Sequence, residues 1–129
     1  MSGESATHIR LVEYLIDQIR RDFGQGQDLA IFADHRSYGG DQPLQIGNYK
    51  PDVYAHDVPC TFRVLGEAKT VGDLETKRTE LQVEAFLDHL SIYPSSKFYF
   101  ATTWTGRLLA SRLLKTLARP EVLTKLLLY

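Results

Sequence analysis

Two carboxylates and a lysine are the residues of this chain best suited to chemistry. Asp52 follows Pro51, and 15 positions later Glu67 stands two residues before Lys69. Carboxylate oxygens are the ligands that Mg²⁺ prefers, and a bound divalent ion polarises a phosphate and lowers the pKa of a bound water. A lysine beside them would stabilise the negative charge that develops in the transition state. The three residues therefore suit metal-assisted hydrolysis of a phosphodiester.

Hairpin geometry is expected to bring Asp52 and Glu67 together. Residues 52–55 and 61–65 have the composition of strands, and residues 56–59 that of the turn between them. In such a hairpin the start of the first strand lies beside the end of the second, so the two acids become cross-strand neighbours. Two adjacent carboxylates repel, and one tends to take up a proton unless a cation is bound. The alternative is a pair of exposed strand-end acids without a metal.

Glu67 and Lys69 are expected to share one face of their strand, because side chains alternate along a strand. This alternation would place the ammonium beside the carboxylate. The alternative is an exposed Glu–Lys pair, which stabilises a protein little. The apolar residues just before it argue against a freely exposed strand; they are Phe62, Val64, Leu65 and Gly66.

This pattern resembles that of the PD-(D/E)XK nucleases, the superfamily of restriction-endonuclease-like enzymes. It stands here as Pro51-Asp52 followed by Glu67-Ala68-Lys69, and its layout is most similar to VRR-NUC and Holliday-junction resolvase-like modules. The resemblance implies a Mg²⁺ ion, for which Mn²⁺ substitutes, held by Asp52, Glu67 and the carbonyl of Ala68. It also implies that Lys69 positions or activates the attacking water.

Two more site residues are implied by the resemblance alone. Members of the superfamily often carry a glutamate on the first helix that completes the metal site, and Glu13 looks like that residue. A glutamine on the second helix orients substrate or water in several branches, and Gln82 stands at the corresponding place. The alternatives are a solvated helix acid for Glu13 and a neutral surface glutamine for Gln82.

Apolar periodicity predicts an α/β fold with a mixed four-stranded sheet flanked by helices. Three strands in succession favour an antiparallel meander, and the helix before the fourth strand implies a parallel crossover. The predicted order α-β-β-β-α-β-α-α is also that of the restriction-endonuclease-like core. The helices are expected over residues 7–23, 74–90, 105–118 and from 120 onward, and the strands over residues 29–33, 52–55, 61–65 and 97–101.

Length and composition indicate one globular domain over residues 1–129. No apolar run approaches the roughly 18 residues that cross a membrane, and the first seven residues lack the apolar core of a signal peptide. Cys60 is the only cysteine, which excludes an internal disulfide and thiolate-rich zinc sites. We therefore expect a cytoplasmic protein.

Charge is distributed unevenly along the chain. The net charge of −1 is not that of a protein that coats DNA generally. Residues 1–60, however, carry nine acids and five bases, whereas residues 61–129 carry seven acids and ten bases. Residues 97–129 hold six bases and one acid, a balance that suits contact with a phosphate backbone. The alternative is a solvated helix face.

Together these features predict a Mg²⁺-dependent endonuclease acting on DNA, with branched or structured DNA among the substrates left open. One alternative is a nucleic-acid-binding module of the same fold without catalysis. Another is an oligomerisation protein built on the Leu-rich tail of residues 122–128. Because so small a module has little obvious DNA-reading surface, we expect it to act as a homodimer or as a subunit of a larger complex.

Overall fold

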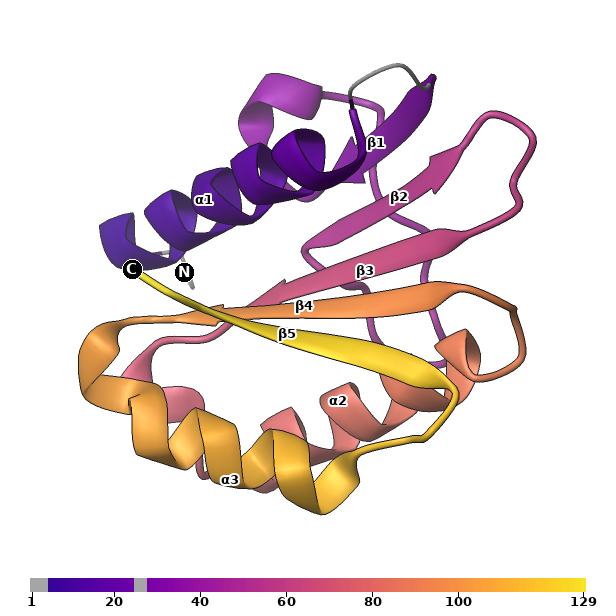
Figure 1. Cartoon of the computed structure of the whole chain (residues 1–129). Coiled ribbons are helices and arrows are strands. Elements are labelled where there is room, and N and C mark those ends of the chain that lie inside the picture. Colours follow the sequence, from indigo (N-terminus) through magenta and orange to yellow (C-terminus); the bar gives the residue numbers. More distant parts are fainter. Residues whose placement is uncertain (1–4, 25–27) are drawn as a thin grey trace.

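A mixed sheet lies at the centre of the structure, with one helix on one face and two on the other (Figure 1). The computed structural model describes residues 5–24 and 28–129, so residues 1–4 of the N-terminal segment lie outside it. The helices are α1 (Ala6–Phe23), α2 (Lys77–Leu90) and α3 (Arg107–Leu117), with single 3₁₀ turns η1 (Arg36–Tyr38), η2 (Val71–Asp73) and η3 (Trp104–Gly106). The strands are β1 (Leu29–Ala33), β2 (Val53–Asp57), β3 (Arg63–Ala68), β4 (Ser96–Thr102) and β5 (Val122–Leu128).

The five strands lie in the sheet in the order in which they occur in the chain. The pairs β1–β2 and β2–β3 are antiparallel, whereas β3–β4 and β4–β5 are parallel. Both parallel connections cross over through a helix, α2 before β4 and α3 before β5. The predicted meander and the predicted parallel crossover are therefore confirmed.

The last element of the chain corrects the prediction of a four-stranded sheet ending in two helices. Residues Val122–Leu128 form β5, which pairs with β4 from Ser96↔Val122 to Thr102↔Leu128. A short Leu-rich run does not by itself distinguish a strand from a helix. Tertiary context decides here, because without β5 the buried strand β4 would leave one row of backbone groups unpaired. The observed order is α-β-β-β-α-β-α-β.

The hairpin between β2 and β3 turns later than predicted. Its connection covers residues 58–62 rather than 56–59. The Asp57 carboxylate closes it by accepting hydrogen bonds from the backbone amides of Thr61 at 2.7 Å and Phe62 at 3.0 Å. Burial acts to raise the pKa of Asp57, but a hydrogen bond from the Thr61 hydroxyl, together with those from the two amides, outweighs it and lowers the pKa. A side-chain acceptor thus fixes the position of the turn.

The second helix begins at Lys77 rather than at residue 74. Thr76 caps it, because its hydroxyl accepts a hydrogen bond from the backbone amide of Thr79 at 3.2 Å. Residues 71–73 form the separate turn η2 before this cap. None of the helices in the described ranges is long and apolar enough to cross a membrane.

A separate hydrophobic core lies on each face of the sheet. On one face α1 buries a stripe that includes Leu11, Leu15 and Ile19. On the other face α2 and α3 pack against the aromatic side chains of β4, among them Phe98. Gly66 in β3 lets α1 approach closely, since a Cβ there would lie 3.4 Å from the Leu15 side chain. The two helix layers therefore hold the end of β3 from both sides.

Candidate active site

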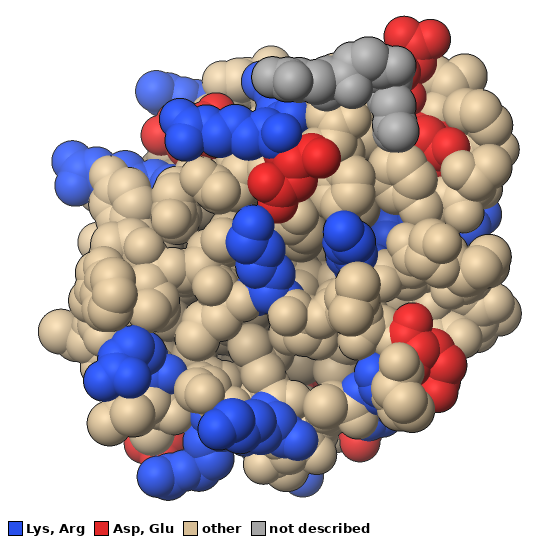
Figure 2. Space-filling model, viewed as in Figure 1, with Lys and Arg blue, Asp and Glu red and all other residues tan. Residues whose placement is uncertain are grey.

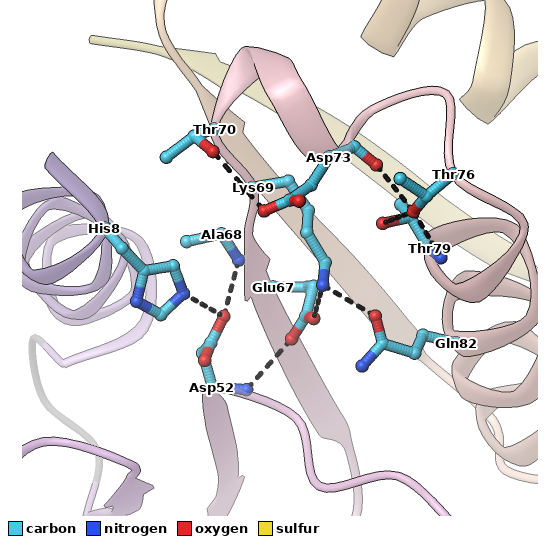
Figure 3. A network of polar contacts seen from close by, with 10 residues as sticks. All are labelled: His8, Asp52, Glu67, Ala68, Lys69, Thr70, Asp73, Thr76, Thr79 and Gln82. Carbon is cyan, nitrogen blue, oxygen red and sulfur yellow. Dashed lines mark hydrogen bonds and ion pairs between the residues drawn. The ribbon is translucent and has the colours of Figure 1, made fainter. Parts of the chain in front are cut away.

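Asp52 and Glu67 lie side by side, as the hairpin prediction required. The register pairs Val53 with Gly66, which places Asp52 opposite Glu67. The Asp52 amide donates a hydrogen bond to Glu67 Oε1 at 3.1 Å, and the Ala68 amide donates one to Asp52 Oδ2 at 2.8 Å (Figure 3). Each carboxylate is thus oriented by the backbone of the opposite strand.

Lys69 and Gln82 extend this pair into a network. Lys69 Nζ lies 3.4 Å from Glu67 Oε2 and donates a hydrogen bond to Gln82 Oε1 at 2.6 Å (Figure 3). Glu67 and Lys69 therefore share a face of the sheet, as alternation predicted. Gln82 is a buried residue of α2 and not a surface glutamine. The ammonium is held between a strand and a helix.

Burial changes the chemistry of the two carboxylates. Asp52 is 7% exposed and Glu67 only 3%. Burial, followed by the negative charge of Asp52, raises the pKa of Glu67 well above its usual range, although the Lys69 ammonium opposes this. A buried carboxyl of this kind gains a proton readily. A cation bound beside Glu67 would instead favour its ionised form.

Glu13 takes no part in the network shown in Figure 3. Its side chain is 54% exposed, and its Oε2 lies 3.0 Å from Nε2 of His35, a residue just after β1. Glu13 is not among the residues that α1 buries against the sheet, so its side chain points away from the sheet. The structure does not bring Glu13 to Asp52 and Glu67, where the resemblance led us to expect it.

His8 is a site residue that the sequence reasoning missed. Its Nε2 lies 3.4 Å from Asp52 Oδ2 (Figure 3). The spacing of the histidines showed no metal-binding pattern, but helical periodicity held the relevant signal. His8 stands three and four residues before Leu11 and Val12, so it lies on the sheet-facing side of α1. The start of α1 thereby becomes part of the site.

The residues present fit a magnesium ion. Asp52 and Glu67 supply adjacent, hard oxygen ligands, and the carbonyl of Ala68 stands next in the chain. Within the described ranges no three His, Cys, Asp or Glu side chains are gathered as a metal cage. The fit rests on the pair of carboxylates, because Mg²⁺ usually takes one or two carboxylates and fills its remaining positions with water and phosphate oxygens.

The basic residues near the C-terminus do not form one continuous patch. Arg107, Arg112 and Lys115 are exposed on α3, whereas Arg119 pairs with Asp88 at 2.9 Å. Figure 2 shows Lys and Arg side chains separated by uncharged surface, several of them over the region where α3 runs in Figure 1. The exposed bases of α3 begin beside the edge of the sheet at which β4 ends.

Comparison of the chain with models of known families, with curated proteins and with solved structures found no match.

Proposed function

We propose that the protein is a Mg²⁺-dependent endonuclease that hydrolyses phosphodiester bonds of DNA, built on a restriction-endonuclease-like domain. One observation carries the proposal. The Lys69 ammonium is held 3.4 Å from the buried Glu67 carboxylate, which also accepts a hydrogen bond from the backbone amide of Asp52, a second buried acid. Two carboxylates and a fixed lysine are what metal-assisted attack on a phosphodiester requires.

Each residue has a distinct role in this proposal. Asp52, Glu67 and the Ala68 carbonyl would hold the Mg²⁺, which supplies a polarised phosphate and a more acidic water when bound. Lys69 would orient that water and neutralise charge on the phosphate oxygens as the water oxygen bonds to phosphorus. The attacking water loses a proton to solvent, the bond from phosphorus to the leaving sugar oxygen breaks, and that oxygen takes up a proton from solvent. Gln82 fixes the Lys69 ammonium by accepting its hydrogen bond.

The test is cleavage of labelled branched, tailed, linear duplex and single-stranded DNA in Mg²⁺, Mn²⁺ or EDTA. We expect cleavage with either metal and none in EDTA. Asp52→Asn should lower the rate at least about a hundredfold, the upper range for residues that only support a metal ligand. It should also weaken Mn²⁺ binding in calorimetric titration. Asp17→Asn, a change of the same kind at an exposed position on α1, serves as the control.

Two outcomes would contradict the proposal. Equal Mn²⁺ affinity in wild type and Asp52→Asn would remove Asp52 from the metal site. Binding of DNA without cleavage of any substrate in either metal would instead identify a binding module of the same fold.

A further inference from the structure

The only tryptophan of the chain is held on the surface. Trp104 is 64% exposed, although tryptophan is usually largely buried in folded proteins. Its backbone is fixed, since it opens η3 and its amide donates a hydrogen bond to the Tyr129 carbonyl at 3.3 Å. A large ring on a fixed backbone loses little conformational entropy when it stacks on a partner.

Trp104 lies near the C-terminal ends of β3 and β4, where the candidate site is located. The Lys69 amide donates a hydrogen bond to the Ala101 carbonyl at 3.0 Å, and Trp104 follows Ala101 by three residues. A chain extends by at most about 3.6 Å per residue, so the Trp104 backbone lies within about 11 Å of that point. In Figure 1 the turn after β4, the end of β5 and the start of α1 gather on the same side.

Other aromatic side chains lie near the same strand ends. Tyr129, whose carbonyl accepts the Trp104 amide, is 53% exposed. Its ring centroid lies 5.4 Å from that of Tyr14 on α1. Tyr129 is thus supported from the α1 side while part of its surface stays open to solvent.

Positive charge accompanies these rings. Arg107 is exposed three residues after Trp104, and α3 contains three bases and no acid. Exposed aromatic rings together with exposed basic side chains are features that bind single-stranded nucleic acid, where nucleotide bases stack on the rings and phosphates contact the basic side chains. In a duplex the faces of the nucleotide bases are already stacked on each other and are not open to a tryptophan.

We propose that Trp104, with Tyr129 beside it, stacks on an unpaired base of the substrate close to the scissile phosphate, so that the protein selects DNA with single-stranded nucleotides. With the Trp104 backbone within about 11 Å of Ala101, we expect that base to lie only a short distance along the strand from the bond to be broken. This distance rests on the proposed function, whereas the stacking itself does not.

Trp104 provides its own readout, because no other tryptophan contributes to the emission. Fluorescence of the whole chain is titrated, with Ca²⁺ in place of Mg²⁺, with a 20-nucleotide oligo(dT), a 20-base-pair blunt duplex and the same duplex with a single-stranded tail. Oligo(dT) and the tailed duplex should quench the emission, and the blunt duplex should not. By fluorescence anisotropy of labelled DNA, Trp104→Ala should weaken binding of oligo(dT) about ten- to a hundredfold. Trp104→Phe should retain most of the affinity.

Ile92→Ala is the matched control. Ile92 is also exposed and apolar, but it precedes the start of β4, whereas Trp104 follows the end of that strand. It should leave every affinity unchanged. Unaltered emission with all three DNAs, or equal loss of affinity for blunt duplex and oligo(dT) in Trp104→Ala, would overturn the inference. Cleavage in Mg²⁺ is scored separately, so that loss of stacking with intact cleavage rejects only the stacking. Quenching without cleavage rejects only the nuclease.

Discussion

Lys69 is the side chain whose surroundings bear most directly on the proposed catalysis. If it stabilises charge only in the transition state, Lys69→Ala should lower the cleavage rate about 10²- to 10³-fold and leave Mn²⁺ affinity nearly unchanged. Lys77→Ala is the control, because Lys77 is exposed and pairs with Glu80. Single-turnover kinetics with calorimetric Mn²⁺ titration provide the measurement. Wild-type cleavage by Lys69→Ala would show that the Glu-x-Lys pattern is not catalytic.

Glu67 gives a prediction about stability that is independent of substrate. Its pKa in the folded state lies above the usual value of 4.5, so between the two values the folded state binds more protons than the unfolded state. Metal-free protein should therefore lose stability as pH rises above about 4.5, until Glu67 is ionised in the fold. Glu67→Gln should remove this loss, giving a higher Tm than wild type at pH 8 and a similar Tm at pH 4.

The control for that measurement is Glu80→Gln, which changes a half-buried acid on α2. It should not alter the pH dependence of Tm. A Tm difference between Glu67→Gln and wild type that is the same at pH 4 and pH 8 would contradict the raised pKa. Glu67→Gln should also fail to cleave DNA, so the same change is expected to stabilise the fold and remove the activity.

The contacts of the site residues were predictable where they followed from local geometry. The contacts of Asp52, Glu67 and Lys69 arise from one hairpin and from alternation along one strand, both of which can be read from spacing. The placement of Glu13 depends on how α1 is rotated on the sheet. The same rotation brings His8 to Asp52, a contact that links residues 44 positions apart. Spacing within the chain does not determine such a contact.

Among the elements, the packing of α1 on β3 depends on a small residue. A Cβ at Gly66 would lie 3.2 Å from the Val53 Cβ and 3.4 Å from the Leu15 side chain. Gly66→Ala should therefore destabilise the protein by about 1–3 kcal/mol through overpacking. Gly40→Ala is the control, because nothing lies within 4 Å of a Cβ at that position. Chemical denaturation measures both, and equal midpoints would show that α1 can shift without cost.

Elements with a strong pattern were predicted and the weakly patterned one was not. The helix α1 shows a regular apolar stripe, and the structure places it within one residue of its predicted bounds. The sequence of β5, VLTKLLL, has no such regularity. Its strand conformation comes from pairing with β4, a partner about 26 residues earlier in the chain. The pairing of β5 with β4 cannot be predicted from the local sequence of β5.

For the molecule as a whole, the exposed bases of α3 should make DNA binding sensitive to salt. Replacing Arg107, Arg112 and Lys115 with glutamine should weaken binding. It should also flatten the plot of log affinity against log salt, by about one unit for each phosphate that is no longer neutralised. Anisotropy titrations between 50 and 200 mM salt, roughly the range in which such effects are large, provide the measurement.

The control for this prediction is the double change of Arg21 and Lys97 to glutamine. Both residues lie where α1 ends and β4 begins, which is the end of β4 away from the candidate site. Their replacement should leave the salt dependence as it is in wild type. An equal change per replaced base in the two variants would assign the effect to net charge rather than to α3.

β5 is an edge strand of the sheet, and this position also affects how copies of the chain behave in concentrated solution. Among residues 5–24 and 28–129, no strand lies on one side of this seven-residue strand, and Leu123 on it is 68% exposed. Such a border is a template on which another chain can add a strand and begin aggregation. Lys125, at the middle of the strand and paired with Asp22 at 2.9 Å, is its only charged residue. Resistance to fibril growth at this border therefore depends largely on one lysine.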